Sequence, residues 1–237
     1  MRLQKITLNN FRCFESLSLE LHPRLTVLVA ENGGGKTAIL DGIAIGLSSV
    51  LRYLSSADQR LTGPGITDTD FRLETIAGPR GGDRLVTSDF SQIIMQTSDG
   101  LTWDNWRASS KGKHPEAKVG HKSLAAYAAE VLDSLKTVKP KLLPVFAYYG
   151  TRRGLLAIPK RLRGAKVDYT QPAAALVGAL DSFSDFTEML NWFDVEETAE
   201  LRANKGSATE DFEESEALHV VREVISAILG GEYSNPY

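Results

Sequence analysis

Apolar and polar residues alternate in two short stretches near the start of the chain, at residues 3–8 and 17–21. This period of two is typical of β-strands that bury one face. A third stretch, residues 25–29, is apolar except for Thr26, and such a run predicts a strand buried on both faces. After a glycine cluster, apolar residues recur at three- and four-residue spacing over residues 39–54, which predicts an amphipathic helix.

The middle of the chain has weaker periodicity. Residues 55–90 are rich in Gly, Pro, Asp and Thr, so we expect irregular structure there with one strand near residues 71–76. Asp99-Gly100 lies between two strand-like runs and predicts a β-hairpin. The remaining expected elements are the hairpin strands at residues 92–97 and 101–107, a helix at residues 123–135 and a buried strand at residues 142–149.

Two helical stripes follow in the last quarter of the chain, at residues 183–193 and 218–228, with the acidic residues 194–216 between them. Together the patterns predict an α/β fold, with a mixed sheet, an antiparallel hairpin and a helix directly after the glycine cluster. We expect this α/β lobe to span residues 1–170. Residues 171–237 predict a mainly helical insertion lobe that is incomplete.

The composition is that of an ordinary globular protein, with 42% hydrophobic residues, 24% charged residues and a formal net charge of −3. Overall charge therefore gives no attraction to nucleic acid or to anionic membranes, and such binding needs a local basic patch. The one cysteine, Cys13, has no zinc-ligand spacing to the four histidines. A single cysteine cannot form an intrachain disulfide, so we expect a reducing, cytoplasmic location. No stretch approaches about 18 consecutive apolar residues, so we expect no membrane span.

The glycine cluster lies in a segment with the pattern of a phosphate-binding loop. Residues 30–37 read Ala-Glu-Asn-Gly-Gly-Gly-Lys-Thr, and the ending Gly-Lys-Thr is the informative part of the P-loop motif. The glycines allow backbone N–H groups to face phosphate oxygens, and the next helix directs the positive end of its dipole at the same anion. Ala30 stands where the motif has its first glycine, so we expect an altered turn. The alternative is a glycine-rich turn that only connects strand and helix.

The motif also assigns chemical roles. Lys36 would neutralise the β- and γ-phosphates as the catalytic cation, and the Thr37 hydroxyl would coordinate Mg²⁺. ATP and Mg²⁺ are therefore the predicted cofactors. The predicted nucleotide contacts within the loop and helix start are Gly33, Gly34, Gly35, Lys36, Thr37 and Ala38.

Several segments together resemble a known family. Ile6-Thr-Leu-Asn-Asn-Phe-Arg-Cys-Phe14, Glu31-Asn-Gly-Gly-Gly-Lys-Thr37 and Leu40-Asp-Gly-Ile43 resemble the N-terminus of ABC-type ATPases of the SMC, RecF and OLD kind. Residues 144–153 and 183–193 are similar to the ATPases of bacterial anti-phage systems, including Septu and retron-associated ones.

The resemblance implies further site residues. A basic residue after the Asn-Phe pair, here Arg12, would lie close to the bound nucleotide, and Asn32 would help to fix the loop. The alternative for Arg12 is an exposed turn arginine. Asp41 is interpreted as a structural cap contact or a surface charge. A glutamine is also expected at Mg²⁺, and this choice stays open among Gln92, Gln96 and Gln171.

The resemblance further implies a signature segment of the Leu-Ser-Gly-Gly type and an apolar strand that ends in Asp-Glu. Neither occurs in the 237 residues. The chain therefore looks like the N-terminal half of a longer ATPase. We expect it to bind ATP but to lack the acid that positions the attacking water.

A basic stretch follows the predicted helix at residues 123–135. Nine basic residues and no acidic residue lie between Ser134 and Val167, in a loop that runs from Lys136 to Lys166. Such a loop suits a nucleic-acid backbone. The alternatives are a solvated loop, or pairing with the acidic residues 194–216.

Three hypotheses of function follow. The leading one is an ATPase head that forms a homodimer or a higher homo-oligomer and acts, with an effector nuclease subunit, in DNA-directed anti-phage defence or DNA repair. The second is a nucleotide-sensing scaffold that binds ATP without turnover and recruits an effector. The third is a small-molecule P-loop kinase, against which the Asn-Phe-Arg opening and the lack of an evident acceptor site argue.

Overall fold

The computed structural model describes residues 1–56, 59–77, 81–151, 167–182, 186–206 and 212–229. The chain divides into two compact units: unit 1 is Met1–Gly150 with Gln171–Ser182, and unit 2 is Thr151–Thr170 with Phe183–Tyr237. The sequence-based boundary at residue 170 differs from this division. Gln171–Ser182 belongs to unit 1 because Leu176 and Leu180 are buried in its core.

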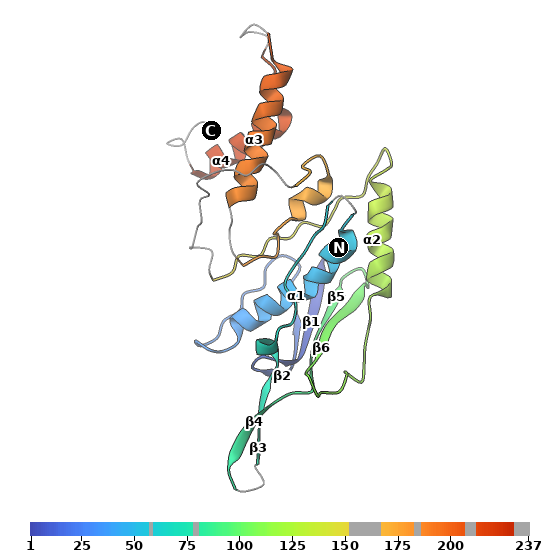
Figure 1. The fold of residues 1–237 in the computed structure, drawn as a ribbon, viewed down its shortest axis with the longest axis vertical. Coiled ribbons are helices and arrows are strands. Elements are labelled where there is room, and N and C mark those ends of the chain that lie inside the picture. Colours follow the sequence, from blue (N-terminus) through green and yellow to red (C-terminus); the bar gives the residue numbers. More distant parts are fainter. Residues whose placement is uncertain (57–58, 78–80, 152–166, 183–185, 207–211, 230–237) are drawn as a thin grey trace. The chain divides into compact units, whose positions relative to one another are not determined.

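Unit 1 is built on a four-stranded antiparallel sheet with the strand order β2-β1-β5-β6 (Figure 1). In β1, Ile6 lies opposite Leu19 of β2 and Met95 of β5, and all the pairings of this sheet are antiparallel. The Asp-Gly pair closes the β5–β6 hairpin with Gly100 at φ 86°, as predicted. The strands are β1 Leu3–Phe11, β2 Phe14–Glu20, β5 Phe90–Thr97 and β6 Thr102–Ala108.

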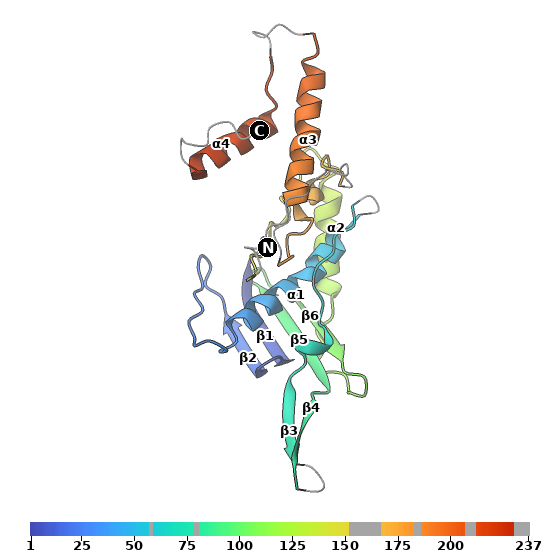
Figure 2. The same ribbon diagram turned by 60° about the vertical axis from the view of Figure 1, so that its left-hand side comes forward.

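Two helices complete the core of unit 1. α1, Lys36–Leu54, lies across one face of the sheet (Figures 1 and 2) and contacts β1, β5 and β6. Gly46 permits this close approach, because an added Cβ there would lie 2.4 Å from Met95 Sδ. By length and composition α1 also qualifies as a membrane span, and 61% of that stretch is buried in the fold. α2, Lys122–Ser134, packs against α1 and β6.

A second, two-stranded ladder of β3, Leu73–Ala77, and β4, Asp83–Thr87, extends from unit 1 (Figure 2). β3 confirms the strand expected near residues 71–76, whereas β4 was not predicted. The base of this ladder is joined to β1 by an antiparallel bridge between Phe11 and Phe71. A short 3₁₀ turn, Asp68–Asp70, precedes it, and a second one, Pro172–Leu176, precedes the end of unit 1.

The two predicted buried strands at residues 25–29 and 142–149 are wrong. Neither segment is in a strand, and large side chains are uncovered in both: Val27 is 69% exposed, Val29 89%, Leu142 93% and Val145 82%. A strand buried on both faces needs ladder partners and covering elements. The described part of the chain provides no ladder partner for either segment.

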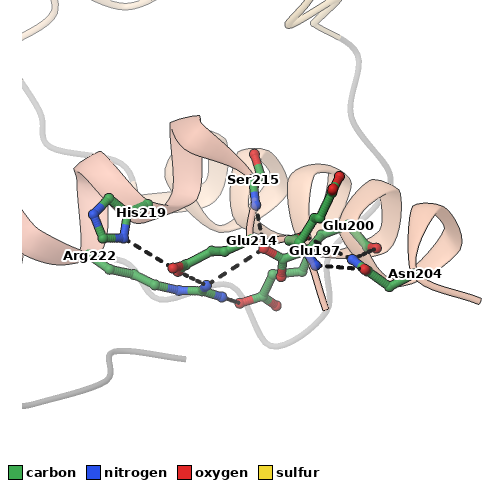
Figure 3. Close-up of polar contacts among 8 residues, drawn as sticks. Glu197, Glu200, Asn204, Glu214, Ser215, His219 and Arg222 are labelled. Carbon is green, nitrogen blue, oxygen red and sulfur yellow. Dashed lines mark hydrogen bonds and ion pairs between the residues drawn. The ribbon is translucent and has the colours of Figure 1, made fainter. Parts of the chain in front are cut away.

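Unit 2 contains α3, Phe186–Ala203, and α4, Glu216–Leu229, which confirms the two predicted helices. α3 continues into the acidic residues that were expected only to separate the helices. Figure 3 shows the polar contacts that join them: Arg222 donates to Glu214 at 2.8 Å and to Glu197 at 3.4 Å. His219 also contacts Glu214, at 3.0 Å. Hydrogen bonds from Arg222 and His219 lower the pKa of Glu214.

Candidate functional site

The glycine loop ends at the first residue of α1. Gly33 and Gly35 have φ of 85° and 83°, in the left-handed region that glycine adopts without steric cost. Gly34 N donates to Glu31 O at 3.0 Å, and Ile39 N donates to Gly35 O at 3.0 Å. Gly35 is the N-cap of α1, and no side chain caps the helix. The first-turn N–H groups therefore lack a side-chain acceptor, which is the arrangement that binds anions.

Lys36 folds back over this loop. Its Nζ donates to Ala30 O at 2.7 Å and to Glu31 O at 2.8 Å. These carbonyls hold the ammonium group at the concave side of the turn, where a phosphate oxygen is the stronger acceptor. The departure at Ala30 is accommodated by Gly34, because an added Cβ at Gly34 would lie 2.8 Å from the Ala30 methyl.

The other predicted loop residues differ in exposure. Asn32 and Thr37 are exposed, so their amide and hydroxyl groups are accessible at the loop. The Ala38 side chain is buried, and this residue offers only its backbone N–H. A hydroxyl oxygen is a ligand type that Mg²⁺ accepts. Among the described residues no group of three or more His, Cys, Asp or Glu is placed to hold a metal.

The turn between β1 and β2 packs directly on the loop. A Cβ added at Gly35 would lie 2.4 Å from Phe14 Cζ and 2.9 Å from Cys13 Sγ. Arg12 in this turn and Asn10 near the end of β1 both have φ of 51°, a conformation that costs a residue such as arginine about 1–2 kcal/mol. The structure thus brings the turn that carries Arg12 next to the glycine loop.

Two carboxylates hold Arg12. Its Nη1 lies 2.5 Å from Asp41 Oδ2, and its Nε lies 2.8 Å from Asp70 Oδ1. Burial lowers the pKa of Arg12, but the hydrogen bonds to Asp41 and Asp70 outweigh burial and raise it. Asp41 also accepts a hydrogen bond from the Tyr148 hydroxyl. Burial, with this hydrogen bond, raises the pKa of Tyr148 to about 12.

The roles of Asp70 and Tyr148 were missed by the sequence reasoning. Asp70 did leave a local signal, because Thr67 and Asp70 have the spacing of a capping box, which the structure contains. Tyr148 left none. Asp41 is not a cap contact, because no side chain caps α1; it pairs instead with Arg12, the predicted nucleotide-binding arginine.

The residues whose roles were left open fall in different places. Gln92 is buried in β5 and its amide donates to Asp104 Oδ2 and to Ala117 O, both at 2.8 Å. Gln96 and Gln171 are exposed.

In the basic stretch, Lys136 pairs with Asp133 at 3.1 Å and Lys141 with Glu130 at 2.5 Å. Six of its basic residues lie outside the described residues: Arg152, Arg153, Lys160, Arg161, Arg163 and Lys166.

Left-handed glycines, an uncapped helix start and a lysine folded over the loop define a P-loop nucleotide-binding protein. Comparison with known families gives the same class. Residues 5–219 match the model of the AAA domain, and the chain belongs to this family of P-loop ATPases. The α/β fold class predicted from the sequence is therefore confirmed.

Curated relatives match short stretches of the chain. Structural maintenance of chromosomes protein 6 of Saccharomyces cerevisiae is 49% identical over 47 residues, which is 20% of this chain and 4% of that protein. The DNA replication and repair protein RecF of Lactococcus lactis is 46% identical over 61 residues, 26% of this chain and 17% of that protein. RecF of Actinobacillus pleuropneumoniae is 46% identical over 43 residues, covering 18% and 12%.

The matched stretches thus span a small share of these relatives. A solved structure from work on ATP-driven dimerization and DNA-stimulated activation of SMC ATPases aligns with 54% of this chain and 80% of that chain, at 14% identity and a TM-score of 0.28. The relation to SMC and RecF ATPases is confirmed, while the likeness to anti-phage ATPases stays a prediction.

Proposed function

We propose that the chain binds ATP with Mg²⁺ at residues 30–38 and is the nucleotide-binding part of a larger SMC/RecF-like ATPase. The geometry of the loop supports this proposal: Gly33 and Gly35 are left-handed, and Lys36 Nζ donates to the carbonyls of Ala30 and Glu31 in the same loop. Phosphate oxygens would replace the carbonyls of Ala30 and Glu31 as acceptors for Lys36. Thr37 would give its hydroxyl oxygen to Mg²⁺, which neutralises phosphate charge.

The flanking residues complete the proposed nucleotide site. Arg12 approaches from the β1–β2 turn, and Asn32 lies at the exposed start of the glycine run. Gly33, Gly34, Gly35, Lys36, Thr37 and Ala38 supply backbone N–H groups to the phosphates.

Completion of the catalytic site by a further protein segment is the second part of the proposal. The uncovered side chains of residues 25–29 and 142–149 form apolar surface on unit 1, and strands from the rest of an ATPase head would cover it. That part would carry the signature segment and the acid that orients water. The isolated chain would then bind ATP and hydrolyse it only at the background rate.

DNA repair or nuclease-coupled anti-phage defence is the proposed setting, in the cytoplasm. The relatives are named for chromosome maintenance and for DNA replication and repair, which supports a DNA-directed role. The proposed partners are a second copy of the chain, an effector nuclease subunit and nucleic acid bound by the basic loop from Lys136 to Lys166. Lys136 and Lys141 are already paired with α2, so DNA contact would depend on the other basic residues of that loop.

Calorimetric titration of ATP in Mg²⁺ tests the nucleotide site. Lys36→Ala should weaken ATP binding strongly and leave the circular dichroism spectrum unchanged, because Lys36 is at the protein surface and contacts only loop carbonyls. Lys122→Ala is the matched control, since Lys122 is the first residue of α2 as Lys36 is of α1. Equal ATP affinity in wild type and Lys36→Ala would contradict the proposal.

Steady-state phosphate release distinguishes the proposal from the scaffold alternative. The chain alone should release phosphate at the background rate, and addition of the completing segment should produce turnover that Lys36→Ala abolishes. Absence of turnover in the completed protein, with ATP binding intact, would favour a scaffold that senses nucleotide. Robust Lys36-dependent turnover by the chain alone would show that it already contains the catalytic acid.

A further inference from the structure

Asp41 connects two distant parts of unit 1 through one carboxylate. Its Oδ2 lies 2.5 Å from Arg12 Nη1, in the β1–β2 turn, and its Oδ1 accepts a hydrogen bond from the hydroxyl of Tyr148. Arg12 and Tyr148 are 29 and 107 residues away from Asp41 in the sequence. Any change in the partner of Asp41 therefore affects both contacts.

The two carboxylates that hold Arg12 are not equivalent. Asp70 has a side chain only 3% exposed, and its second oxygen accepts hydrogen bonds from Thr67 N and Thr67 Oγ1, both at 2.8 Å. Asp41 has a side chain 24% exposed, and the hydroxyl of Tyr148 is the other partner described for it. Asp70 therefore anchors the Nε end of the guanidinium, while the Asp41 contact at Nη1 is nearer to solvent and easier to exchange.

The exchangeable contact lies beside the glycine loop. Asp41 follows Thr37 by four residues in α1, so the two side chains lie on one face of the helix, with Cβ atoms about 6 Å apart. The neighbours of Arg12, Cys13 and Phe14, lie against Gly35. Because the guanidinium is planar and rigid, a small movement of the whole group, and not a rotation within it, would release Nη1 from Asp41 while Nε stays near Asp70.

We propose that Asp41 is a positioning residue that competes with the nucleotide phosphates for Arg12. ATP binding transfers Nη1 of Arg12 from the carboxylate of Asp41 to a phosphate oxygen, and Asp41 keeps Tyr148 as its partner. A phosphate has more negative charge than a carboxylate and accepts bidentate hydrogen bonds from arginine. This inference rests on the proposed ATP site.

A double-mutant cycle on ATP affinity tests the competition. Asp41→Asn removes the competing charge, so it should tighten ATP binding about five- to tenfold, the size expected for a partly exposed ion pair. In an Arg12→Gln background the same change should have less than about a twofold effect, because the competed group is gone. A merely structural role for Asp41 would not raise affinity.

Glu31→Gln is the matched charge control. Glu31 lies in the glycine loop with an exposed side chain, and Glu31→Gln removes one negative charge, as Asp41→Asn does. Any gain from Glu31→Gln should be equal with Arg12 present and in the Arg12→Gln background, since general electrostatics does not depend on Arg12. Adenosine, which has no phosphate, should bind wild type and Asp41→Asn equally.

The outcomes separate this inference from the proposed function. If ATP binding is Lys36-dependent but Asp41→Asn gives no gain, or gives the same gain without Arg12, the competition is refuted and the ATP site stands. If ATP binding does not depend on Lys36, the proposed function itself fails. Should Arg12→Gln not fold, Arg12→Lys replaces it. A lysine nitrogen does not hold Asp70 and a phosphate together in the way the guanidinium does, so the gain should again shrink.

Discussion

Two glycines of the loop provide a matched test of how the β1–β2 turn supports it. Gly33 and Gly35 have nearly the same φ, 85° and 83°, so alanine has the same backbone cost at both positions. An added Cβ at Gly33 has nothing within 4 Å, whereas at Gly35 it would lie 2.4 Å from Phe14 Cζ and 2.9 Å from Cys13 Sγ. The difference between the two variants therefore measures packing against the turn.

The magnitude follows from these contacts. Left-handed alanine costs about 1–2 kcal/mol, and the reduced entropy of the unfolded chain returns about 0.4–1 kcal/mol, so Gly33→Ala should destabilise by about 1 kcal/mol. Gly35→Ala adds the displacement of Phe14 by about 1 Å from normal contact distance, an overpacking cost of about 1–3 kcal/mol. We expect Gly35→Ala to be less stable than Gly33→Ala by about 2 kcal/mol.

Urea unfolding followed by tryptophan fluorescence measures this difference. The chain has three tryptophans, and a Trp192→Phe background leaves Trp103 and Trp106 of unit 1 as the reporters. With an m-value of about 2 kcal/mol/M, the Gly35→Ala midpoint should lie about 1 M below that of Gly33→Ala. Equal midpoints would refute the packing of the turn against Gly35.

Three further predictions concern other parts of the molecule. The absorbance difference at high pH between wild type and Tyr148→Phe should titrate with a pKa of about 12, and titration near 10 would contradict this. Because folding raises the pKa of Tyr148, the stabilisation of the fold by the protonated hydroxyl is present below about pH 10 and is lost as pH rises toward 12. Val29→Thr should change the free energy of unfolding by less than about 0.5 kcal/mol, since the side chain is 89% exposed; a loss of about 2 kcal/mol or more would show a buried strand. Arg222→Gln should raise the NMR-measured pKa of Glu214, because Arg222 lowers it in the wild type. The stabilisation of the fold by this pair is present above the ordinary glutamate pKa and is lost as pH falls. An unchanged pKa in Arg222→Gln would refute the pairing.

Elements with local signals were predictable from the sequence. β1, β2, α1 and the β5–β6 hairpin each show their period or turn residues within a few positions. β4 shows neither, because all of its residues, Asp83–Thr87, are exposed and none requires an apolar partner face. The run at residues 25–29 has an apolar pattern, but burial depends on neighbouring strands that a local pattern does not contain.

The glycine loop and Lys36 were predictable for the same reason, because phosphate binding needs glycines and a lysine at fixed local spacing. The contacts of Arg12 were not. Asp70 is 58 residues from Arg12, and Tyr148 is 107 residues from Asp41, so no periodicity or motif relates them. Only the fold brings these side chains to one place.

The conformation of Arg12 shows why the segment before β3 matters to the site. A left-handed arginine is unfavourable by about 1–2 kcal/mol, yet its N–H donates to Asp70 O at 2.8 Å, and Arg72 N donates to Asn10 O at 3.1 Å. The contacts with Asp70 come from a part of the chain that the sequence assigned to irregular structure, and Arg72 lies at the start of the strand expected near residues 71–76. Strain that is held in place beside a binding loop is evidence for a functional constraint. The segment before β3 therefore acts as the support that fixes the conformation of Arg12, two residues before the Phe14 that packs on the glycine loop.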